Sequence, residues 1–227
     1  MEEGRHSVKL AVLGKPNTGK STLTNLLTGL DLSIVSPIAG TTRDVVKGSF
    51  SYKGKEFTIL DTAGIRRKSK VEEDVEYYSV NRAIKTIDEA DVVLLVVDAT
   101  EGLSEQDKKI ANLIVRRGKG VVIALNKTDL LKGVPNERQA IEDRVRFQFP
   151  ILNFAPIRFI SAVTGDGVAD MLDTVLKVNV QLAKRVDTAV LNTALKTWGE
   201  AYQPSRGAEG HFKVYYGTQT SAQPVKF

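Results

Sequence analysis

The chain has 227 residues, of which 42% are hydrophobic and 26% are charged, a composition that is ordinary for a soluble globular protein. It contains no cysteine, which excludes a disulfide framework and a thiolate metal site. The longest apolar run, Val92–Val97, is only as long as a strand, so we expect no membrane span. The net charge of +5 permits a nucleic-acid partner without demonstrating one.

The first predicted element is a strand at Val8–Leu13, followed directly by a glycine-rich octapeptide, Gly14–Ser21, and a helix at Lys20–Leu30. Strand, G-x-x-x-x-G-K-S and helix in this order predict a phosphate-binding loop, because glycines let successive N–H groups point at an anion and the helix N-terminus adds donors. A glycine-rich turn that binds nothing is the alternative. The residues expected to contact phosphates are Gly14, Lys15, Asn17, Thr18, Gly19, Lys20, Ser21 and Thr22.

The elements that follow alternate between strands and helices. Further strands are predicted at Val45–Tyr52, Lys55–Leu60, Asp91–Val97, Val121–Leu125 and Ile157–Ile160, the first two joined by a turn at Lys53–Gly54. Further helices are predicted at Val75–Ile87, Ser104–Arg117 with Ser104 as N-cap, Asn136–Phe147 and Val168–Leu182. Apolar strands separated by helices predict an α/β fold, a mostly parallel sheet with helices on both faces, and phosphate sites lie at the carboxyl ends of such strands.

The composition changes after about Ala183. We expect a helix at Arg185–Leu195 that begins at Asp187 or Thr188, and strands at Phe212–Tyr216 and from Pro224 onward. The core of this segment would include Trp198. One helix and one or two strands cannot bury a sizeable core alone. The segment is therefore either an annex of the first domain or a truncated second domain.

Four short motifs lie at predicted strand ends or in the loop after the first helix: Thr41–Asp44, Asp61–Gly64, Asn126–Asp129 and Ser161–Val163. Asp61 can hold Mg²⁺ through its water shell, and Gly64 can approach a γ-phosphate. Each motif alone is weak, but all four after a phosphate-binding loop predict a GTP site.

The base-reading residues follow from the chemistry of guanine. The two carboxylate oxygens of Asp129 can accept from the N1–H and the exocyclic amine, a donor pair that adenine lacks, which argues against an ATPase or kinase. Asn126 can brace the base and neighbouring loops, and the Lys127 stem can pack on the ring. The backbone of Ser161, Ala162 and Val163 could meet the guanine O6, although Ser161–Ala162 by itself reads as a strand-end turn.

Four motifs resemble those of the translation-factor-related GTPases, and among them the second GTPase domain of the EngA (Der) family. They are the octapeptide Gly14–Ser21, Gly40–Asp44, Asp61–Arg67 and Asn126–Asp129. The tail, with Arg185–Asn192 and Lys213–Gln219, is similar to the start of that family's KH-like domain. The resemblance implies a GTPase domain at 1–183, a truncated partial α+β KH-like segment at 184–227, and a fragment that lacks the family's first GTPase domain. It also implies a bacterial, cytoplasmic protein, expected to be a monomer, that acts with rRNA in biogenesis of the large (50S) ribosomal subunit.

The expected catalytic residues are Lys20, Thr42, Gly64 and Asn17. Mg²⁺ would be held by Ser21, Thr42 and Asp61, with Thr41 a competitor of Thr42. Ile65 stands where many GTPases carry a water-positioning Gln, so hydrolysis needs other support. Resemblance to related families suggests K⁺ held by Asn17, while a turn residue chosen for its backbone is the other reading. The alternative function is a nucleotide-gated RNA-binding module with negligible turnover.

Overall fold

The structure is a computed structural model that describes residues 7–29, 48–60, 75–201, 214–222 and 225–227, with the backbone alone for 75–80. The chain divides into two compact units, Met1–Asn179 and Val180–Phe227. Each unit is described by itself. The predicted loops that carry Thr41, Thr42, Asp61, Gly64 and Ile65 lie outside the described residues.

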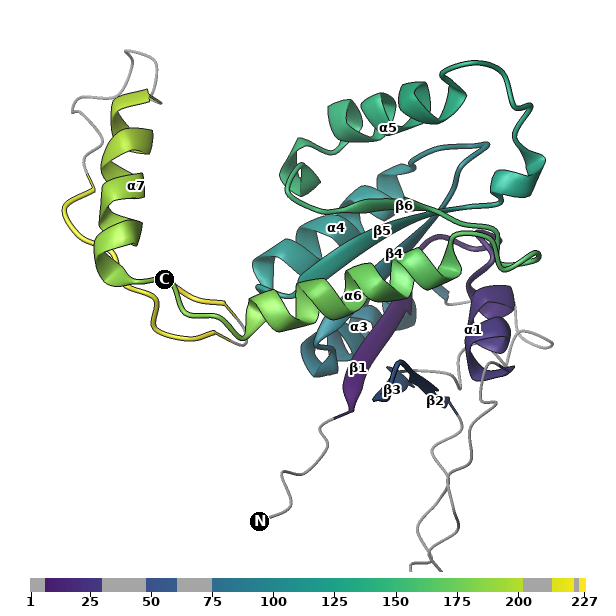
Figure 1. The fold of residues 1–227 in the computed structure, drawn as a ribbon, viewed down its shortest axis with the longest axis horizontal. Helices are drawn as coiled ribbons and strands as arrows, with labels where there is room; N and C mark the ends of the chain where they lie inside the picture. The colour runs from purple at the N-terminus through teal and green to yellow at the C-terminus, as the bar shows by residue number, and fades with distance from the viewer. Residues whose placement is uncertain (1–6, 30–47, 61–74, 202–213, 223–224) are drawn as a thin grey trace, which may run out of the picture. The chain divides into compact units, whose positions relative to one another are not determined.

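The first unit contains a six-stranded sheet in the order β2-β3-β1-β4-β5-β6 (Figure 1). The strands are β1 (Val8–Leu13), β2 (Ser49–Tyr52), β3 (Lys55–Leu60), β4 (Val92–Asp98), β5 (Gly120–Asn126) and β6 (Ile157–Phe159). Only β2 and β3 pair antiparallel, and the other neighbours pair parallel. The predicted mostly parallel sheet is therefore confirmed. Because β4 and β5 end in register at Asp98 and Asn126, their terminal side chains meet at the carboxyl edge.

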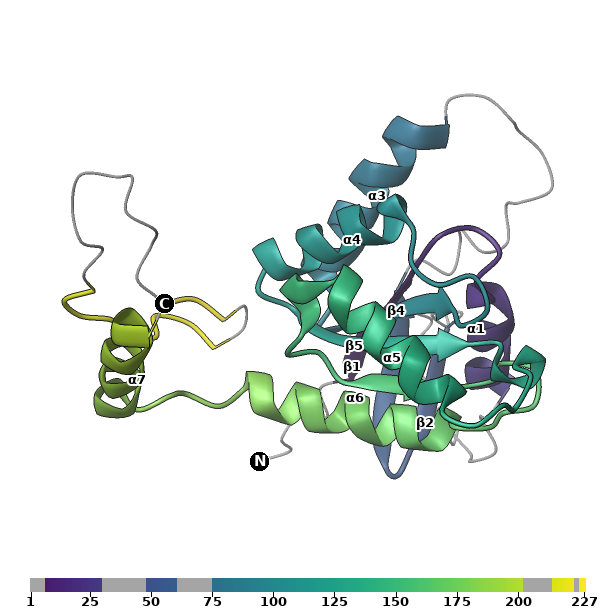
Figure 2. The same cartoon turned by 90° about the horizontal axis from the view of Figure 1, so that it is seen from above.

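Helices cover both faces of this sheet, as predicted. They are α1 (Lys20–Gly29), α3 (Val75–Glu89), α4 (Glu105–Arg116), α5 (Glu137–Gln148) and α6 (Val168–Leu182), with short 3₁₀ turns η1 (Thr128–Leu130) and η2 (Pro150–Leu152). Figure 2 shows α3 and α4 on one face and α6 on the opposite face. Every residue of β4 and β5 is buried, which explains their continuous apolar sequence, since both faces of a parallel sheet are covered.

Two local features that were predicted from neighbouring residues, a helix N-cap and a turn, are present in the structure. Ser104 is the N-cap of α4, and its hydroxyl and N–H form a capping box with Asp107. The turn between β2 and β3 has positive φ at both Lys53 and Gly54, 48° and 73°, which matches the right-handed twist of the paired strands.

The second unit contains α7 (Thr188–Ala201), which begins after Asp187. The Asp187 carboxylate accepts from the Ala189 N–H at 2.8 Å, so it caps the helix. The Asn192 side chain exchanges two 2.8 Å hydrogen bonds with the backbone of Gly217. Gln219, buried, accepts from the Val186 N–H at 2.7 Å. Two side-chain amides thus hold the tail segments together.

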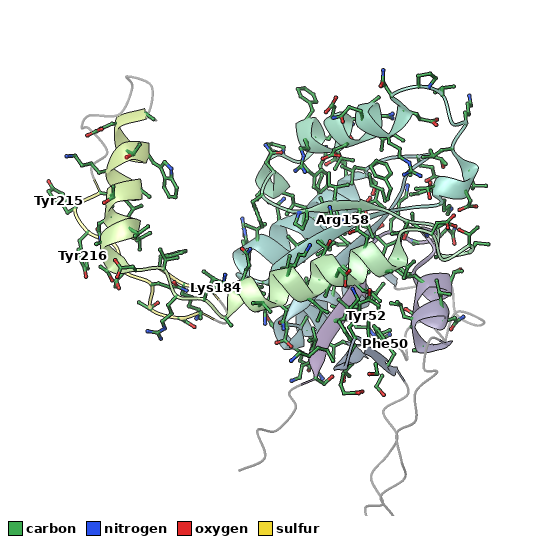
Figure 3. All side chains as sticks on the ribbon, viewed as in Figure 1. Phe50, Tyr52, Arg158, Lys184, Tyr215 and Tyr216 are labelled. Carbon is green, nitrogen blue, oxygen red and sulfur yellow. The ribbon has the colours of Figure 1, made fainter. Side chains whose placement is uncertain are left out.

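Two expectations for this unit are wrong. Trp198 is 56% exposed and not in a core. Leu191, two helical turns earlier, is buried, and Leu195 packs close to Gly217, but more than half of the Trp198 side chain is exposed. Val214, Tyr215 and Tyr216 do not form the predicted strand, and both tyrosines are exposed (Figure 3). Near the end, pairing in the described part amounts to one isolated bridge between Ser221 and Lys226.

Candidate nucleotide-binding site

The glycine-rich loop joins β1 to α1 at the carboxyl edge of the sheet. Gly14 has φ of 149°, and a Cβ there would lie 2.2 Å from the Val96 carbonyl oxygen. Gly19 has φ of 92°, and a Cβ there would lie 2.2 Å from Nδ2 of Asn126. Both glycines are therefore required by close approach as well as by backbone conformation. The loop is packed tightly against the ends of β4 and β5.

Within the loop, the Lys15 carbonyl is a shared acceptor. The Thr18 hydroxyl donates to it at 3.1 Å, and the Lys20 ammonium donates to it as well. Thr18 is fully buried, whereas Ser21 and Thr22 in the first turn of α1 are exposed. Asn17 is also exposed and adopts a left-handed φ of 63°. The loop thus holds a lysine ammonium and exposed hydroxyls at the N-terminus of a helix, an arrangement suited to an anion.

Asn126 connects the two halves of the candidate site. Its Nδ2 donates to the Thr18 carbonyl at 2.8 Å, and its Oδ1 accepts from the Ala162 N–H at 2.9 Å. The Asn126 side chain is almost fully buried. One amide therefore joins the glycine-rich loop to the turn after β6.

Lys127 and Asp98 form a second link at the same edge. Lys127 has a left-handed φ of 68°, and its ammonium lies 2.6 Å from Oδ2 of Asp98. Burial raises the pKa of Asp98, but the Lys127 ammonium and the Thr100 hydroxyl and N–H outweigh it, so the pKa lies below the ordinary carboxyl value. Asp98 therefore stays ionised and holds Lys127 in place.

The Asp129 carboxylate is exposed, and the buried Ser161 hydroxyl donates to its Oδ1 at 2.6 Å. The Thr164 N–H in turn donates to Ser161 Oγ at 3.1 Å. This chain leaves the second Asp129 oxygen, Oδ2, outside the Ser161 contact. In the same turn Ala162 is buried and Val163 is 75% exposed. The structure thus gathers Asn126, Asp129 and the 161–163 turn at one place.

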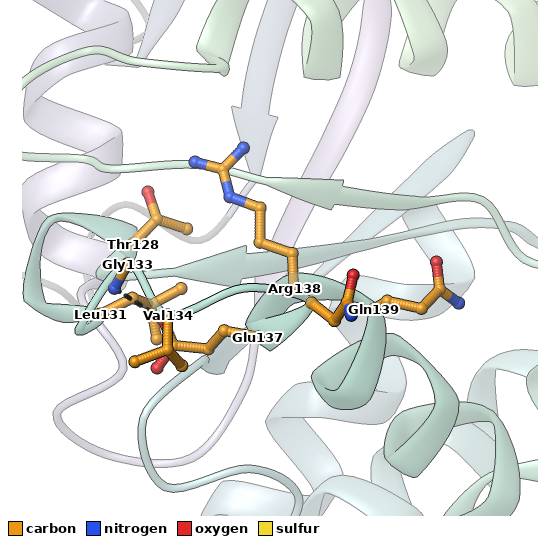
Figure 4. Close-up of a pocket in the computed structure, with 8 residues that line it drawn as sticks. Thr128, Leu131, Gly133, Val134, Glu137, Arg138 and Gln139 are labelled. Carbon is orange, nitrogen blue, oxygen red and sulfur yellow. Dashed lines mark hydrogen bonds between the residues drawn. The ribbon is translucent and has the colours of Figure 1, made fainter.

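A hollow of about 340 Å³ borders η1 and the start of α5 (Figure 4). Its lining includes Thr128 and Val134 but none of the residues predicted to bind nucleotide. The Glu137 carboxylate accepts from the Gly133 N–H at 2.9 Å, and the Arg138 guanidinium lies 5.5 Å from the centre of the Phe159 ring. These contacts hold the loop that follows Asp129.

Two buried carboxylates at the site were not found by sequence reasoning. Asp98 is 2% exposed and acts on Lys127, as described. Asp107 is fully buried, and its Oδ1 accepts from the Lys15 N–H at 3.2 Å. The spacing Ser104-x-x-Asp107 is a capping-box pattern that sequence alone can reveal. The contact to Lys15 spans 92 residues and leaves no local signal.

A family model described as 50S ribosome-binding GTPase matches residues 9–127, just over half of the chain. The chain belongs to this GTPase family. A second model, described as the KH-domain-like C-terminal part of EngA bacterial GTPase enzymes, matches residues 185–227. This confirms the resemblance stated from the motifs, for the tail as well as for the first unit.

The chain is similar to proteins named GTPase Der. GTPase Der of Treponema pallidum is 49% identical over 220 residues, which are 97% of this chain and 48% of that protein. GTPase Der of Fusobacterium nucleatum is 45% identical over 227 residues, which are 100% of this chain and 52% of that protein. The chain therefore spans about half the length of the curated relatives it matches.

Two solved structures of Era share the GTPase fold. Era in complex with MgGDPNP and a segment of 16S ribosomal RNA is 33% identical with a TM-score of 0.56, and the match covers 76% of this chain and 57% of that one. A variant of Aquifex aeolicus Era bound to GDP and AlF4⁻ is 34% identical with a TM-score of 0.55 over the same shares. No helix in the described ranges is long and apolar enough to cross a membrane.

Proposed function

We propose that the chain is a GTP-binding and GTP-hydrolysing switch that acts in biogenesis of the 50S ribosomal subunit. The observation that carries the proposal is the Asn126 bridge between the Thr18 carbonyl and the Ala162 N–H. A phosphate loop and a base-reading turn joined by one buried amide form a site for a whole nucleotide and not for a phosphate alone. The family description and the Der relatives support the ribosomal role.

Each end of the nucleotide has its own proposed contacts. The phosphates would lie on the loop, with the Lys20 ammonium and the N–H groups from Gly14 to Thr22 around them. The base would lie between Asp129, the Lys127 stem and the 161–163 turn. The Ser161 hydroxyl holds Oδ1 of Asp129, which orients the carboxylate. A fixed carboxylate discriminates guanine from adenine better than a mobile one, because less rotamer freedom is lost on binding.

The proposed Mg²⁺ ligands are Ser21, Thr42 and Asp61, of which Ser21 lies among the described residues. Its hydroxyl is exposed next to Lys20, and oxygen donors with bound waters suit Mg²⁺. The ion would neutralise phosphate charge, with Gly64 close to the γ-phosphate. We include K⁺ at Asn17, which is exposed at the mouth of the loop. Asparagine also tolerates the left-handed backbone conformation of this position, so Asn17 has two explanations, a K⁺ ligand and a turn residue.

We further propose that residues 1–183 form the GTPase domain and 184–227 the beginning of a KH-like domain. The tail holds six Lys and Arg residues against three Asp and Glu, a net charge of +3, which suits a partner such as rRNA. The protein would act as a monomer in the bacterial cytoplasm, where ribosomes are assembled.

The test is nucleotide selection by Asp129. The wild type is expected to bind GDP and GTP, and Asp129→Asn is expected to prefer XDP to GDP in calorimetry, because the xanthine O2 presents an acceptor where guanine presents an amine. Asp166→Asn, an exposed carboxylate nearby, is the matched control and should keep the GDP preference. Unchanged preference in Asp129→Asn would refute the base assignment. Nucleotide binding without phosphate release would favour the RNA-binding module.

A further inference from the structure

Asp107 is a fully buried carboxylate in the first turn of α4, and it accepts hydrogen bonds from backbone N–H groups and a hydroxyl. Its Oδ2 accepts from the Ser104 N–H at 3.0 Å and from the Ser104 hydroxyl at 2.7 Å. Its Oδ1 accepts from the backbone N–H of Lys15 at 3.2 Å. The first two bonds cap the helix. The third reaches the second residue of the phosphate loop and is not needed for capping.

Lys15 is held at three points. Its N–H donates to Asp107, its ammonium lies 2.5 Å from Glu101, and its carbonyl accepts from Lys20 and Thr18. The Glu101 hydrogen bond raises the pKa of Lys15, so its ammonium stays charged. The Glu101 contact is at the surface, where an ion pair adds little, because the carboxylate side chain is 61% exposed. The Asp107 contact is partly buried and acts on the Lys15 backbone itself, so it is the more direct constraint on the loop.

We propose that Asp107 is a positioning residue for phosphate binding, acting through Lys15 on Lys20. The Asp107 carboxylate fixes the orientation of the Lys15 peptide N–H, and the carbonyl of the same residue receives the Lys20 ammonium. A loop freed at Lys15 would offer Lys20 a displaced acceptor. The cost would fall on the phosphate end of the nucleotide and not on the base end. This inference rests on the proposed function, because it assigns a role within the proposed GTP site.

The comparison of Asp107→Ala with Ser104→Ala separates positioning from helix stability. Both variants lose the capping box, but Asp107→Ala alone loses the bond to Lys15. We expect GDP affinity, measured by calorimetry, to fall about tenfold or more in Asp107→Ala, the loss typical of a hydrogen bond to a charged group. Ser104→Ala is expected to stay within about twofold of the wild type, since its loss falls on helix capping.

A second readout is the ³¹P resonance of the β-phosphate in bound GDP, which a purely structural role would not move. It is expected to shift in Asp107→Ala and to remain in place in Ser104→Ala. If Asp107→Ala does not fold, Asp107→Asn takes its place, because it retains an oxygen that can accept from the Lys15 N–H. Its affinity for GDP should be lower than that of the wild type, but by less than about tenfold. Equal affinities and equal ³¹P shifts in the Asp107 and Ser104 variants would overturn the positioning role, whereas a wild type that does not bind GDP would overturn the proposed function itself.

Discussion

Replacing Asn126 by Ala should destabilise the fold and weaken nucleotide binding together. The side chain makes two hydrogen bonds of 2.8 and 2.9 Å, both buried, and is itself 2% exposed. Its loss leaves the Thr18 carbonyl and the Ala162 N–H without these partners. Each unsatisfied buried group costs about 1–3 kcal/mol, so the free energy of unfolding should fall by about 2–6 kcal/mol. That is a large part of the stability of a typical domain.

Urea denaturation followed by circular dichroism measures this change, with calorimetric GDP titration of the folded variant beside it. Asn112→Ala is the matched control, because the Asn112 amide donates to the Lys108 carbonyl on an exposed helix surface. The control should change the free energy of unfolding by less than about 0.5 kcal/mol. A loss below about 1 kcal/mol in Asn126→Ala, or unchanged GDP affinity, would refute the view that this amide joins the two loops.

Three further changes test other parts of the site. Phosphate release in single turnover should be faster in KCl than in NaCl at equal ionic strength, and Asn17→Ala should abolish the difference; equal slow rates in both salts would leave Asn17 as a turn residue. Gly19→Ala should weaken GDP binding in calorimetry, because its Cβ would lie 2.2 Å from Nδ2 of Asn126 at a φ of 92°; normal affinity would contradict the close packing. Asp98→Asn should lower the free energy of unfolding by about 1–3 kcal/mol at pH 7, because a hydrogen-bonded charge partner of Lys127 is lost. The folded-state pKa of Asp98 is lowered, so its contribution to the free energy of unfolding is present above the ordinary carboxyl pKa of about 3.9 and is lost as the pH falls through the folded value. The free energies of unfolding of wild type and variant, measured in urea, should therefore converge in acid. A difference that stays constant with pH would contradict this.

The sequence predicted the order of the elements well, for physical reasons that are local. Continuous apolar runs such as Val92–Val97 have to be buried on both faces, and β4 is. The Ser104 N-cap and the turn at Lys53–Gly54 depend on neighbouring residues alone, and both are present. Element ends differ by a few residues, as at α7, which runs to Ala201 instead of ending near Leu195.

The tail was predicted less well, because whether an apolar residue is buried there depends on partners that the local sequence does not specify. Trp198 was expected in the core of the tail, and it follows Leu191 by two helical turns of α7. Leu191 is buried, but Trp198 is 56% exposed. Periodicity identifies a face and says nothing of how far along the helix a partner extends. Likewise, β-branched and aromatic residues at 214–216 favoured a strand, but a strand needs a neighbour to pair with.

The motifs of the candidate site could be predicted from the sequence, but the buried side chains that hold its loops in place could not. Asp98, Asp107 and Asn126 are buried polar residues, and each would cost stability if its polar atoms were unpaired. In each case at least one partner lies on a nucleotide loop: Lys127 for Asp98, Lys15 for Asp107, and both Thr18 and Ala162 for Asn126.

This distribution of partners gives the three side chains different roles. Asp107 accepts a hydrogen bond from Lys15 in the glycine-rich loop, Asp98 pairs with Lys127 in the loop after β5, and Asn126 bonds to both the glycine-rich loop and the turn after β6. Loss of Asp107 should therefore affect the phosphate contacts, loss of Asp98 should affect the base contacts, and loss of Asn126 should affect both. A stability measurement alone would rank all three as core defects. Nucleotide affinity and selectivity have to be measured beside stability. They distinguish residues that only stabilise the core from buried residues that also position the nucleotide-binding loops.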